Sequence, residues 1–146
     1  MAIAFSDSIE GINWTALKAT LAADHFDNGR TVGQMERSFR NSYCCAIARH
    51  GVAVVGTARA LSDGVCNAYV VDMWTHSAYR RRGIGRRMLD ELCAQLSGQH
   101  VYLFTDEAHE FYAACGFVAR GTGLEKLIGK WLDNASRDAA PGNASR

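Results

Sequence analysis

The chain has 146 residues, of which 48% are hydrophobic and 21% charged, and its formal net charge is +1. This length suits one domain with its own hydrophobic core, and the composition excludes a wholly disordered chain. The near-neutral charge argues against a global attraction to nucleic acid or anionic membranes, and no apolar run reaches the ~20 residues of a membrane span.

The five cysteines are an odd number, and none of them forms a CxxC pair: Cys44, Cys45, Cys66, Cys93 and Cys115. This usage is typical of reduced thiols, and no secretory signal pattern precedes them, so we expect a cytoplasmic protein. The five histidines have no zinc-like spacing with the cysteines, so we expect no metal.

The N-terminal third of the chain predicts one strand and two helices. A short apolar run, Ala2–Phe5, predicts the strand. Apolar residues at helical spacing from Trp14 onward predict a helix that ends near Asp24. Thr31 is the expected N-cap of a second helix, with Gln34 as its capping-box partner.

Three β-rich runs come next, and two turns separate them. The runs are Cys44–Ala48, Val52–Ala60 and Ala68–Thr75, with turns at 49–51 and 63–64. Short connections of this kind join antiparallel neighbours, so the three runs predict a meander.

The rest of the chain alternates helix and strand patterns. From Ile84 to Leu96 the apolar residues fall on one helical stripe with charged residues opposite. Downstream we expect a strand, a short helix and two further strands, at Val101–Phe104, Ala108–Cys115, Phe117–Ala119 and Leu124–Leu132, with a possible bulge at Gly129. The order predicts a mixed α+β fold with a mostly antiparallel sheet flanked by helices. We expect a single domain over residues 1–133 and a disordered tail over 134–146.

The most informative segment is Arg80-Arg81-Arg82-Gly83-Ile84-Gly85, which follows a strand and opens the amphipathic helix. Its two glycines let the backbone approach a ligand closely. The free N–H groups and the dipole of a helix N-terminus attract phosphate, and Arg86 and Arg87 add positive charge. The segment therefore predicts an anion site that suits a diphosphate.

Other motifs fit this segment less well. A P-loop requires Lys followed by Ser or Thr, and a dinucleotide fingerprint requires a third glycine where Met88 stands. A basic nucleic-acid-binding helix and a solvated arginine-rich helix start both remain open.

Two motifs together resemble a known family. Arg80-x-x-Gly83-x-Gly85 matches the (Gln/Arg)-x-x-Gly-x-(Gly/Ala) signature of GNAT N-acetyltransferases, which holds the CoA diphosphate. Downstream, Ala108, Phe111-Tyr112 and Gly116-Phe117 are similar to the family's A-x-x-(L/F)-Y-x-x-x-G-F motif. Within the family, the stretch from Thr57 to Gly85 looks most like small bacterial and arylalkylamine-type members.

The resemblance implies the GNAT fold, acetyl-CoA as co-substrate and transfer of its acetyl group to a primary amine by direct attack. The amine belongs to a small molecule or a peptide, and no nucleic acid or membrane partner is implied. Relatives that dimerise through late strands make a homodimer possible here. The implied cofactor contacts are Met73, Trp74, Thr75, Arg80, Arg81, Arg82, Gly83, Ile84, Gly85, Arg86 and Thr105. Many members have proline at Ser77 and asparagine at Thr105, so these two positions depart from the pattern.

Tyr112 and Asp72 are the candidate catalytic residues. The matching tyrosine of the family points at the CoA sulfur, so Tyr112 is a candidate general acid; alternatively it packs in the core beside Phe111. Asp72 is the only acid in an apolar strand, which makes it a candidate base or an anchor for the substrate ammonium. Its alternative is a salt bridge with an arginine such as Arg59. His76 is a weaker candidate base.

The acceptor site is expected between the N-terminal helices and the meander. The loop His25–Arg30 would line it with Trp74, and Asp72 or Asp27 would hold the ammonium; alternatively Phe26 fills the core. Two rival functions stay open. One is a nucleic-acid-binding module, and the other is a degenerate domain that binds acetyl-CoA as a sensor without turnover.

Overall fold

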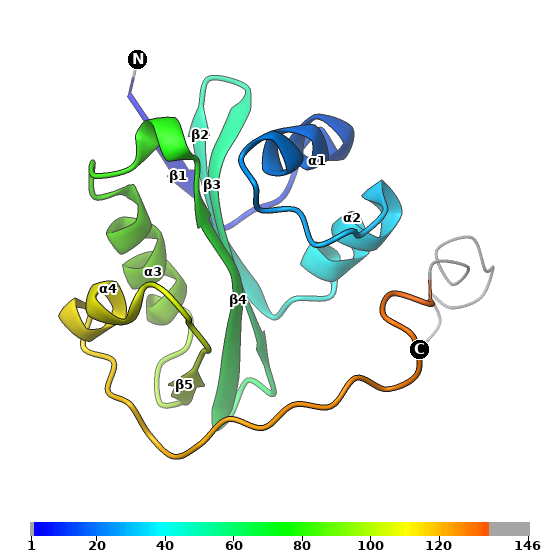
Figure 1. Cartoon of the computed structure of the whole chain (residues 1–146). Coiled ribbons are helices and arrows are strands. Elements are labelled where there is room, and N and C mark those ends of the chain that lie inside the picture. The colour runs from blue at the N-terminus through cyan, green and yellow to red at the C-terminus, as the bar shows by residue number, and fades with distance from the viewer. Residues whose placement is uncertain (1, 135–146) are drawn as a thin grey trace.

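The computed structural model describes residues 2–134, in which five strands form one sheet between two layers of helices (Figure 1). In chain order, the sheet consists of β1 (Ala4–Ser6), β2 (Cys44–His50), β3 (Ala53–Ser62), β4 (Asn67–Thr75) and β5 (His100–Tyr102). Neighbouring strands are antiparallel, except that β4 and β5 run parallel. This confirms the predicted mixed α+β class and its mostly antiparallel sheet.

The helices divide between the two faces of the sheet. Helices α1 (Trp14–Ala23) and α2 (Val32–Arg40) cover one face, and α3 (Ile84–Ala94) covers the other (Figure 1). The short helix α4 (His109–Ala114) lies beside α3, and a 3₁₀ turn, η1 (Ser77–Tyr79), connects β4 to the α3 loop.

Both N-terminal helices begin at side-chain caps. The Asn13 carboxamide accepts a hydrogen bond from the Ala16 N–H at 3.0 Å. Thr31 and Gln34 form the predicted capping box, with bonds of 3.0 and 2.9 Å. These caps fix the two ends of the polar loop between the helices, since each satisfies N–H groups that the first turn leaves unpaired.

Side chains of β2 alternate between two cores. Ala46 and Ala48 face α3, whereas Cys45 and Ile47 face α1 and α2. Alternation is the consequence of the strand's two-residue period. The small alanines let α3 approach the sheet closely, and Met88 of that helix is fully buried.

Strand β4 contains a bulge and then separates from β5. Thr57 pairs with Trp74 and Arg59 with Val71, so two residues of β4, Asp72 and Met73, oppose a single residue of β3. Asp72 has a φ of 52°, and its carbonyl accepts the Thr57 hydroxyl at 2.7 Å. The parallel ladder with β5 ends at Tyr69, which leaves the β5 side of residues 70–75 outside the ladder. Bulges are frequent beside active sites because they re-aim neighbouring side chains.

The prediction of two late strands was wrong. Within the described residues, no strand follows Tyr102, and residues 117–132 form turns and irregular chain instead of strands at 117–119 and 124–132. The pairing of β5 spans three residues, so its free edge is a short template for a further strand. Glycines at 121, 123 and 129 also raise the entropic cost of an extended conformation. The predicted disordered tail lies outside the described residues, apart from Asn134.

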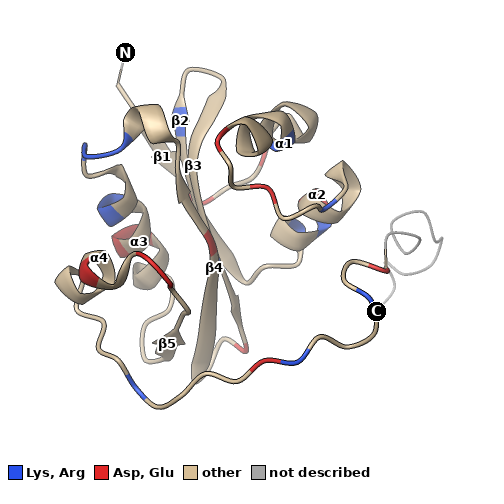
Figure 2. Cartoon of the chain, in the orientation of Figure 1, with Lys and Arg blue, Asp and Glu red and all other residues tan. Residues whose placement is uncertain are grey.

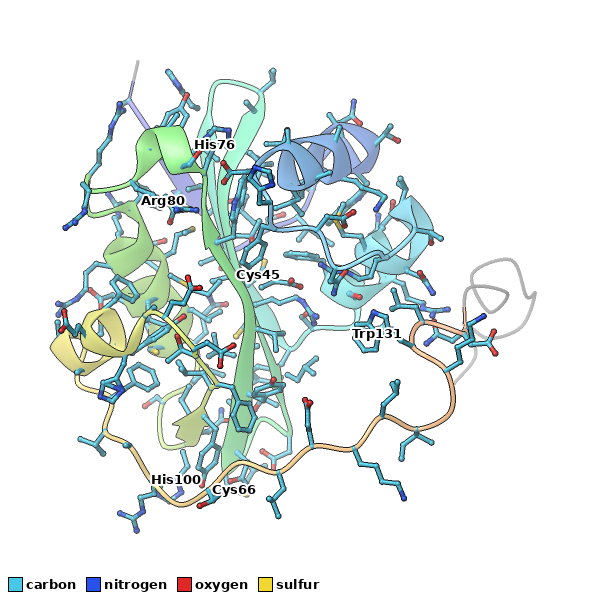
Figure 3. The ribbon with its side chains drawn as sticks, in the orientation of Figure 1. Cys45, Cys66, His76, Arg80, His100 and Trp131 are labelled. Atoms are coloured by element: carbon cyan, nitrogen blue, oxygen red, sulfur yellow. The ribbon has the colours of Figure 1, made fainter. Side chains whose placement is uncertain are left out.

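The end of the described chain returns to the N-terminal helices. The Gln34 side chain donates to the Leu132 carbonyl at 2.9 Å, and the Trp131 indole donates to the Asn28 carbonyl at 3.2 Å. Figure 3 shows Trp131 beside α2, far along the chain from the helix it contacts. These bonds tie the C-terminal segment to the loop between α1 and α2.

Candidate active site

The arginine–glycine segment forms the entrance to α3, as predicted. Gly83 is the N-cap, its φ is 76°, and no side chain caps the helix. The first-turn N–H groups therefore have no side-chain partner and remain available to an anion. A side chain at Gly83 would have open space around it, so the glycine is required by its backbone conformation and not by crowding.

The arginines around this entrance have different surroundings. Arg81 has no side-chain partner within residues 2–134, and its φ is 64°. Arg80 donates to the Thr75 carbonyl at 3.1 Å and lies at the end of β4 near His76 (Figure 3). Arg82 stacks on the Tyr79 ring at 5.1 Å, and Arg87 stacks on the Phe5 ring at 4.2 Å.

A cavity of about 460 Å³ connects this entrance to the end of β4 and to α4. Three predicted cofactor arginines line it, together with both glycines and the predicted strand residues. The lining residues used below are Met73, Trp74, Thr75, Arg80, Arg81, Gly83, Ile84, Gly85, Arg86 and Tyr112. The structure thus brings together ten of the predicted site residues from three separate elements.

Gly85 keeps the centre of this cavity open. A Cβ atom there would lie 3.3 Å from the Thr75 hydroxyl and 3.5 Å from the Phe111 ring. Because β4, α3 and α4 converge at this point, a larger residue at position 85 would fill the passage between them. The glycine therefore preserves a route from the α3 entrance to Tyr112.

The ring of Tyr112 is packed, whereas its hydroxyl has no partner among the described residues. Its side chain is mostly buried against Phe111 and Phe117, with ring centroids 5.1 and 5.8 Å away. Within residues 2–134 its hydroxyl forms no hydrogen bond, and no side-chain oxygen or nitrogen there is both buried and unpartnered. The hydroxyl is thus exposed to a cavity. Burial raises the pKa of the Tyr112 phenol, and nearby Cys115 raises it further.

Asp72 lies in an ion-pair cluster. Both of its carboxylate oxygens accept from Arg30 at 3.0 Å, and the Arg59 Nε lies 2.5 Å from one of them. The three side chains are 7–13% exposed. A salt bridge with Arg59 was the alternative to a catalytic role for Asp72, and the structure contains that salt bridge. Arg30 is a second partner that sequence reasoning missed.

Asp24 is a second acidic anchor that the sequence did not indicate. Its carboxylate accepts from the Trp74 indole at 2.9 Å and from the Ser77 N–H at 3.0 Å, and it also bonds the Ser77 hydroxyl. Burial alone would raise the pKa of Asp24, but these hydrogen bonds together bring it below its ordinary value. Asp24 thereby joins the end of α1 to the end of β4.

Three predicted residues lie away from the cavity. The Thr105 hydroxyl accepts from the Ala108 N–H at 2.9 Å at the start of α4. The His76 Nδ1 accepts from the Ala78 N–H at 3.0 Å and caps η1. Arg82 is turned onto Tyr79. Thr105 and His76 thus have local structural roles, and neither lines the cavity at the α3 entrance.

The loop His25–Arg30, which we call the acceptor loop because it was predicted to line the acceptor site, has one residue at the cavity. Phe26, 38% exposed, lines the cavity and lies beside Trp74, whose side chain is buried in the core with α1 and α2. Asp27 is paired with Lys18 at 3.1 Å. The loop is therefore placed beside the site as expected, but its candidate anchor Asp27 already has a cationic partner.

Comparison with known proteins identifies this arrangement. The model of the acetyltransferase (GNAT) domain family matches residues 41–119, which include β2–β5, the α3 entrance and Tyr112. The chain belongs to the GNAT acetyltransferase family. The match begins after α2, so the N-terminal helices and the acceptor loop lie outside it.

Sequence relatives of this GNAT domain include two soybean (Glycine max) proteins. One is named histone acetyltransferase TAP1, 28% identical over 120 residues, and the other is the acetyltransferase TAP2, 26% identical over 121 residues. These matches cover 72% of this chain but only 51% and 48% of the relatives. The chain thus spans about half the length of the curated relatives it matches.

Solved structures share the GNAT fold at low identity. A GNAT-family protein from Xanthomonas campestris pv. campestris has a TM-score of 0.76 and 20% identity, over 91% of this chain and 98% of its own. Glucosamine-6-phosphate N-acetyltransferase from Arabidopsis thaliana has a TM-score of 0.72 and 14% identity, over 89% and 100%. At these identities the likeness concerns the fold alone.

Two structural features are absent from residues 2–134 of this GNAT chain, a membrane-spanning helix and a metal-binding group. None of the helices there combines the length and apolar character of a membrane span. The same residues contain no group of three His, Cys, Asp or Glu side chains arranged to hold a metal ion. The five cysteines, all within this range, are free thiols.

Proposed function

We propose that this GNAT domain is an acetyl-CoA-dependent N-acetyltransferase that moves an acetyl group to a primary amine by direct attack. One observation carries the proposal: a single cavity joins an uncapped helix N-terminus with free arginine charge to the unbonded hydroxyl of Tyr112. A diphosphate at one end and a thioester at the other suit such a passage.

The residues at the α3 entrance fit the diphosphate of acetyl-CoA. The N–H groups of the first helical turn would donate hydrogen bonds to its oxygens, and Arg81 would add an unpaired cation. The strand residues Met73–Thr75 lie beyond the end of the β5 ladder, so their backbone groups would pair with the pantetheine arm. Acetyltransferases of the GNAT family generally use acetyl-CoA, which supports the same co-substrate here.

In the proposed reaction, the amine nitrogen attacks the thioester carbonyl carbon and the C–S bond breaks. Tyr112 gives its hydroxyl proton to the departing sulfur, and the proton that the amine loses passes to solvent and restores the phenol. The sign of the pKa shift suits this role, since a raised pKa keeps the phenol protonated at neutral pH.

Asp72 is better suited to positioning than to proton transfer. Two guanidinium groups occupy its carboxylate, and a base must have an oxygen free to receive a proton. We therefore assign Asp72 to holding the bulge of β4 against the start of α2, because Arg30 immediately precedes the Thr31 cap.

Tyr112→Phe tests the assignment of the acid. We expect turnover, measured as amine-dependent release of CoA thiol, to fall about 10²–10⁴-fold while acetyl-CoA affinity stays within about twofold. The alkaline limb that belongs to the phenol should also disappear from the kcat profile. Tyr43→Phe is the matched control, because Tyr43 is half exposed and lines none of the described cavities.

Two outcomes would contradict the proposal. Equal losses of turnover and acetyl-CoA affinity in Tyr112→Phe would remove the acid role and leave a packing role. A thermal shift with acetyl-CoA but no thiol release with any amine would favour the sensor alternative. The engagement of Asp72 by two arginines makes that alternative worth testing, since it removes the most obvious base.

A further inference from the structure

A second cavity lies on the other side of Tyr112. Its volume is about 430 Å³, and it lies between β4 and the chain that runs from β5 to α4. It shares Phe26, Met73, Ala108 and Tyr112 with the first cavity. We call it the acceptor groove, because under the proposed function an amine must reach the thioester from a direction that the CoA arm leaves open.

The charge of the acceptor groove is opposite to that of the first cavity. Its charged lining residues are Asp72, Asp106 and Glu107, and no lysine or arginine lines it. Asp72 is paired with two arginines, Arg30 and Arg59, which do not line the groove, so this cluster adds no net negative charge. Asp106 and Glu107 have no partner within residues 2–134 and are exposed, so they carry the uncompensated charge.

Figure 2 shows this asymmetry along the chain. Acidic residues mark the segment before α4 and a short part of β4, whereas basic residues mark the loop that enters α3. The two charge groups therefore belong to different segments of the chain.

The walls of the groove are aromatic and aliphatic. The Tyr69 and Phe104 rings meet edge to face with centroids 5.8 Å apart, and Phe26 also lines the groove. Alkyl chains pack on such surfaces, and ammonium groups are attracted to the faces of aromatic rings.

Tyr112 also lines this groove, independently of its acids. Tyr112 is 9% exposed, and its hydroxyl lacks any hydrogen-bond partner in the described chain. Because the hydroxyl itself is accessible, it is free to bond a group that enters the groove. Tyr112 lines both the groove and the donor cavity, so under the proposed function the reacting amine lies beside it.

We propose that the acceptor is a flexible alkyl amine that carries a second positive charge. Its reacting amine, deprotonated, lies near Tyr112, its chain packs along Phe26, Tyr69 and Phe104, and its second cation is held by Asp106 and Glu107. This inference rests on the proposed acetyl transfer and selects a substrate class for it. A free diamine and a lysine side chain beside another basic residue share this chemistry.

The test compares amines of equal chain length with and without the second charge. Butylamine and 1,4-diaminobutane are assayed for CoA release at one pH, with wild type and with the double variant Asp106→Asn/Glu107→Gln. Wild type should prefer the diamine about fivefold to tenfold in kcat/KM, as expected for two partly exposed ion pairs. The double variant should lose this preference through KM for the diamine alone, with unchanged kinetics for butylamine. High salt should weaken it.

Glu110→Gln is the control, because Glu110 is an exposed acid on α4 that does not line the groove. A blocked peptide with two adjacent lysines, compared with one in which the second lysine is glutamine, distinguishes a protein side chain from a free diamine. Preference for the dibasic peptide over 1,4-diaminobutane assigns the groove to proteins, and the reverse preference assigns it to small diamines.

Binding separates this inference from the proposed function. Calorimetric titration of 1,4-diaminobutane into the CoA-bound protein should give binding that the double variant weakens about tenfold. Such binding without any thiol release would support the groove and overturn acetyl transfer. Equal kcat/KM for monoamine and diamine, or a double variant that affects both amines alike, would overturn the inference while leaving the enzyme intact.

Discussion

The two cavities that meet at Tyr112 differ in charge and in the way the chain builds them. The donor cavity is formed mainly by one nearly continuous stretch, from Met73 to Arg86, with α4 closing its inner end. The acceptor groove draws on Phe26, residues 69–73, residues 103–108 and Tyr112, which are separated along the chain. A continuous stretch leaves a sequence motif, whereas scattered segments do not.

The family match over residues 41–119 contains the whole α3 entrance and most of the groove, but it does not reach Phe26 or Arg30. Under the proposed function, changes in the donor cavity should alter acetyl-CoA binding, and changes around the groove should alter amine selection. The following substitutions test that separation.

The largest effect on acetyl-CoA affinity is expected for Gly83→Val at the α3 entrance. A β-branched residue at a φ of 76° is strained, and its side chain would stand where the diphosphate approaches the helix amides. We expect acetyl-CoA affinity to fall about a hundredfold, or roughly 3 kcal/mol, by calorimetry. Gly98→Val is the matched control: Gly98 has a φ of 82° and equally open surroundings outside the site. Equal losses of affinity in both variants would mean that backbone strain alone is responsible.

The largest effect on folding stability concerns Asp72, which joins the groove to the N-terminal helices. Asp72→Ala leaves two largely buried guanidiniums without their carboxylate, so we expect the free energy of unfolding to fall by about 3–5 kcal/mol. Asp72→Asn tolerates the same positive φ and should lose less. Chemical denaturation measures both changes. If Asp72→Asn instead removed the acidic limb of the kcat profile at unchanged stability, Asp72 would be the base and not a positioning residue.

A smaller effect is expected for the unpaired arginine of the donor cavity. Arg81→Gln removes a cation without breaking a protein ion pair, so acetyl-CoA affinity should fall about tenfold, the range of a hydrogen bond to a charged group. Arg87→Gln is its control, since Arg87 stacks on Phe5 and bonds Glu91. Affinity should stay unchanged there, and KM for the amine should change in neither variant.

The smallest effect is the pH dependence that Asp24 gives to the attachment of α1. The folded pKa of Asp24 is lowered, so its contribution to stability is present above the ordinary aspartate pKa of about 3.9 and is lost as pH falls through the folded value. Asp24→Asn should flatten the acid arm of stability by about 1 kcal/mol, measured by thermal unfolding between neutral and acidic pH. An unchanged acid arm would assign that stability to other carboxylates, such as Asp27.

Local patterns predicted the elements that depend on neighbouring residues. The capping box at Thr31, the meander and the amphipathic stripe of α3 were all correct because each is set by residues within a few positions of one another. The strand predicted at Leu124–Leu132 failed, since strand formation requires a partner edge and β5 pairs over only three residues.

The sequence by itself determined the class of the fold, the glycine–arginine entrance to α3 as a candidate anion site and the candidacy of Tyr112, because turn residues, helix periodicity and a spaced motif encode them locally. Only the tertiary structure decided that Asp72 is held by Arg30 and Arg59 and that Asp106 and Glu107 remain unpaired beside the groove. Ion pairing depends on distances between residues far apart in the chain, and a linear pattern does not specify them.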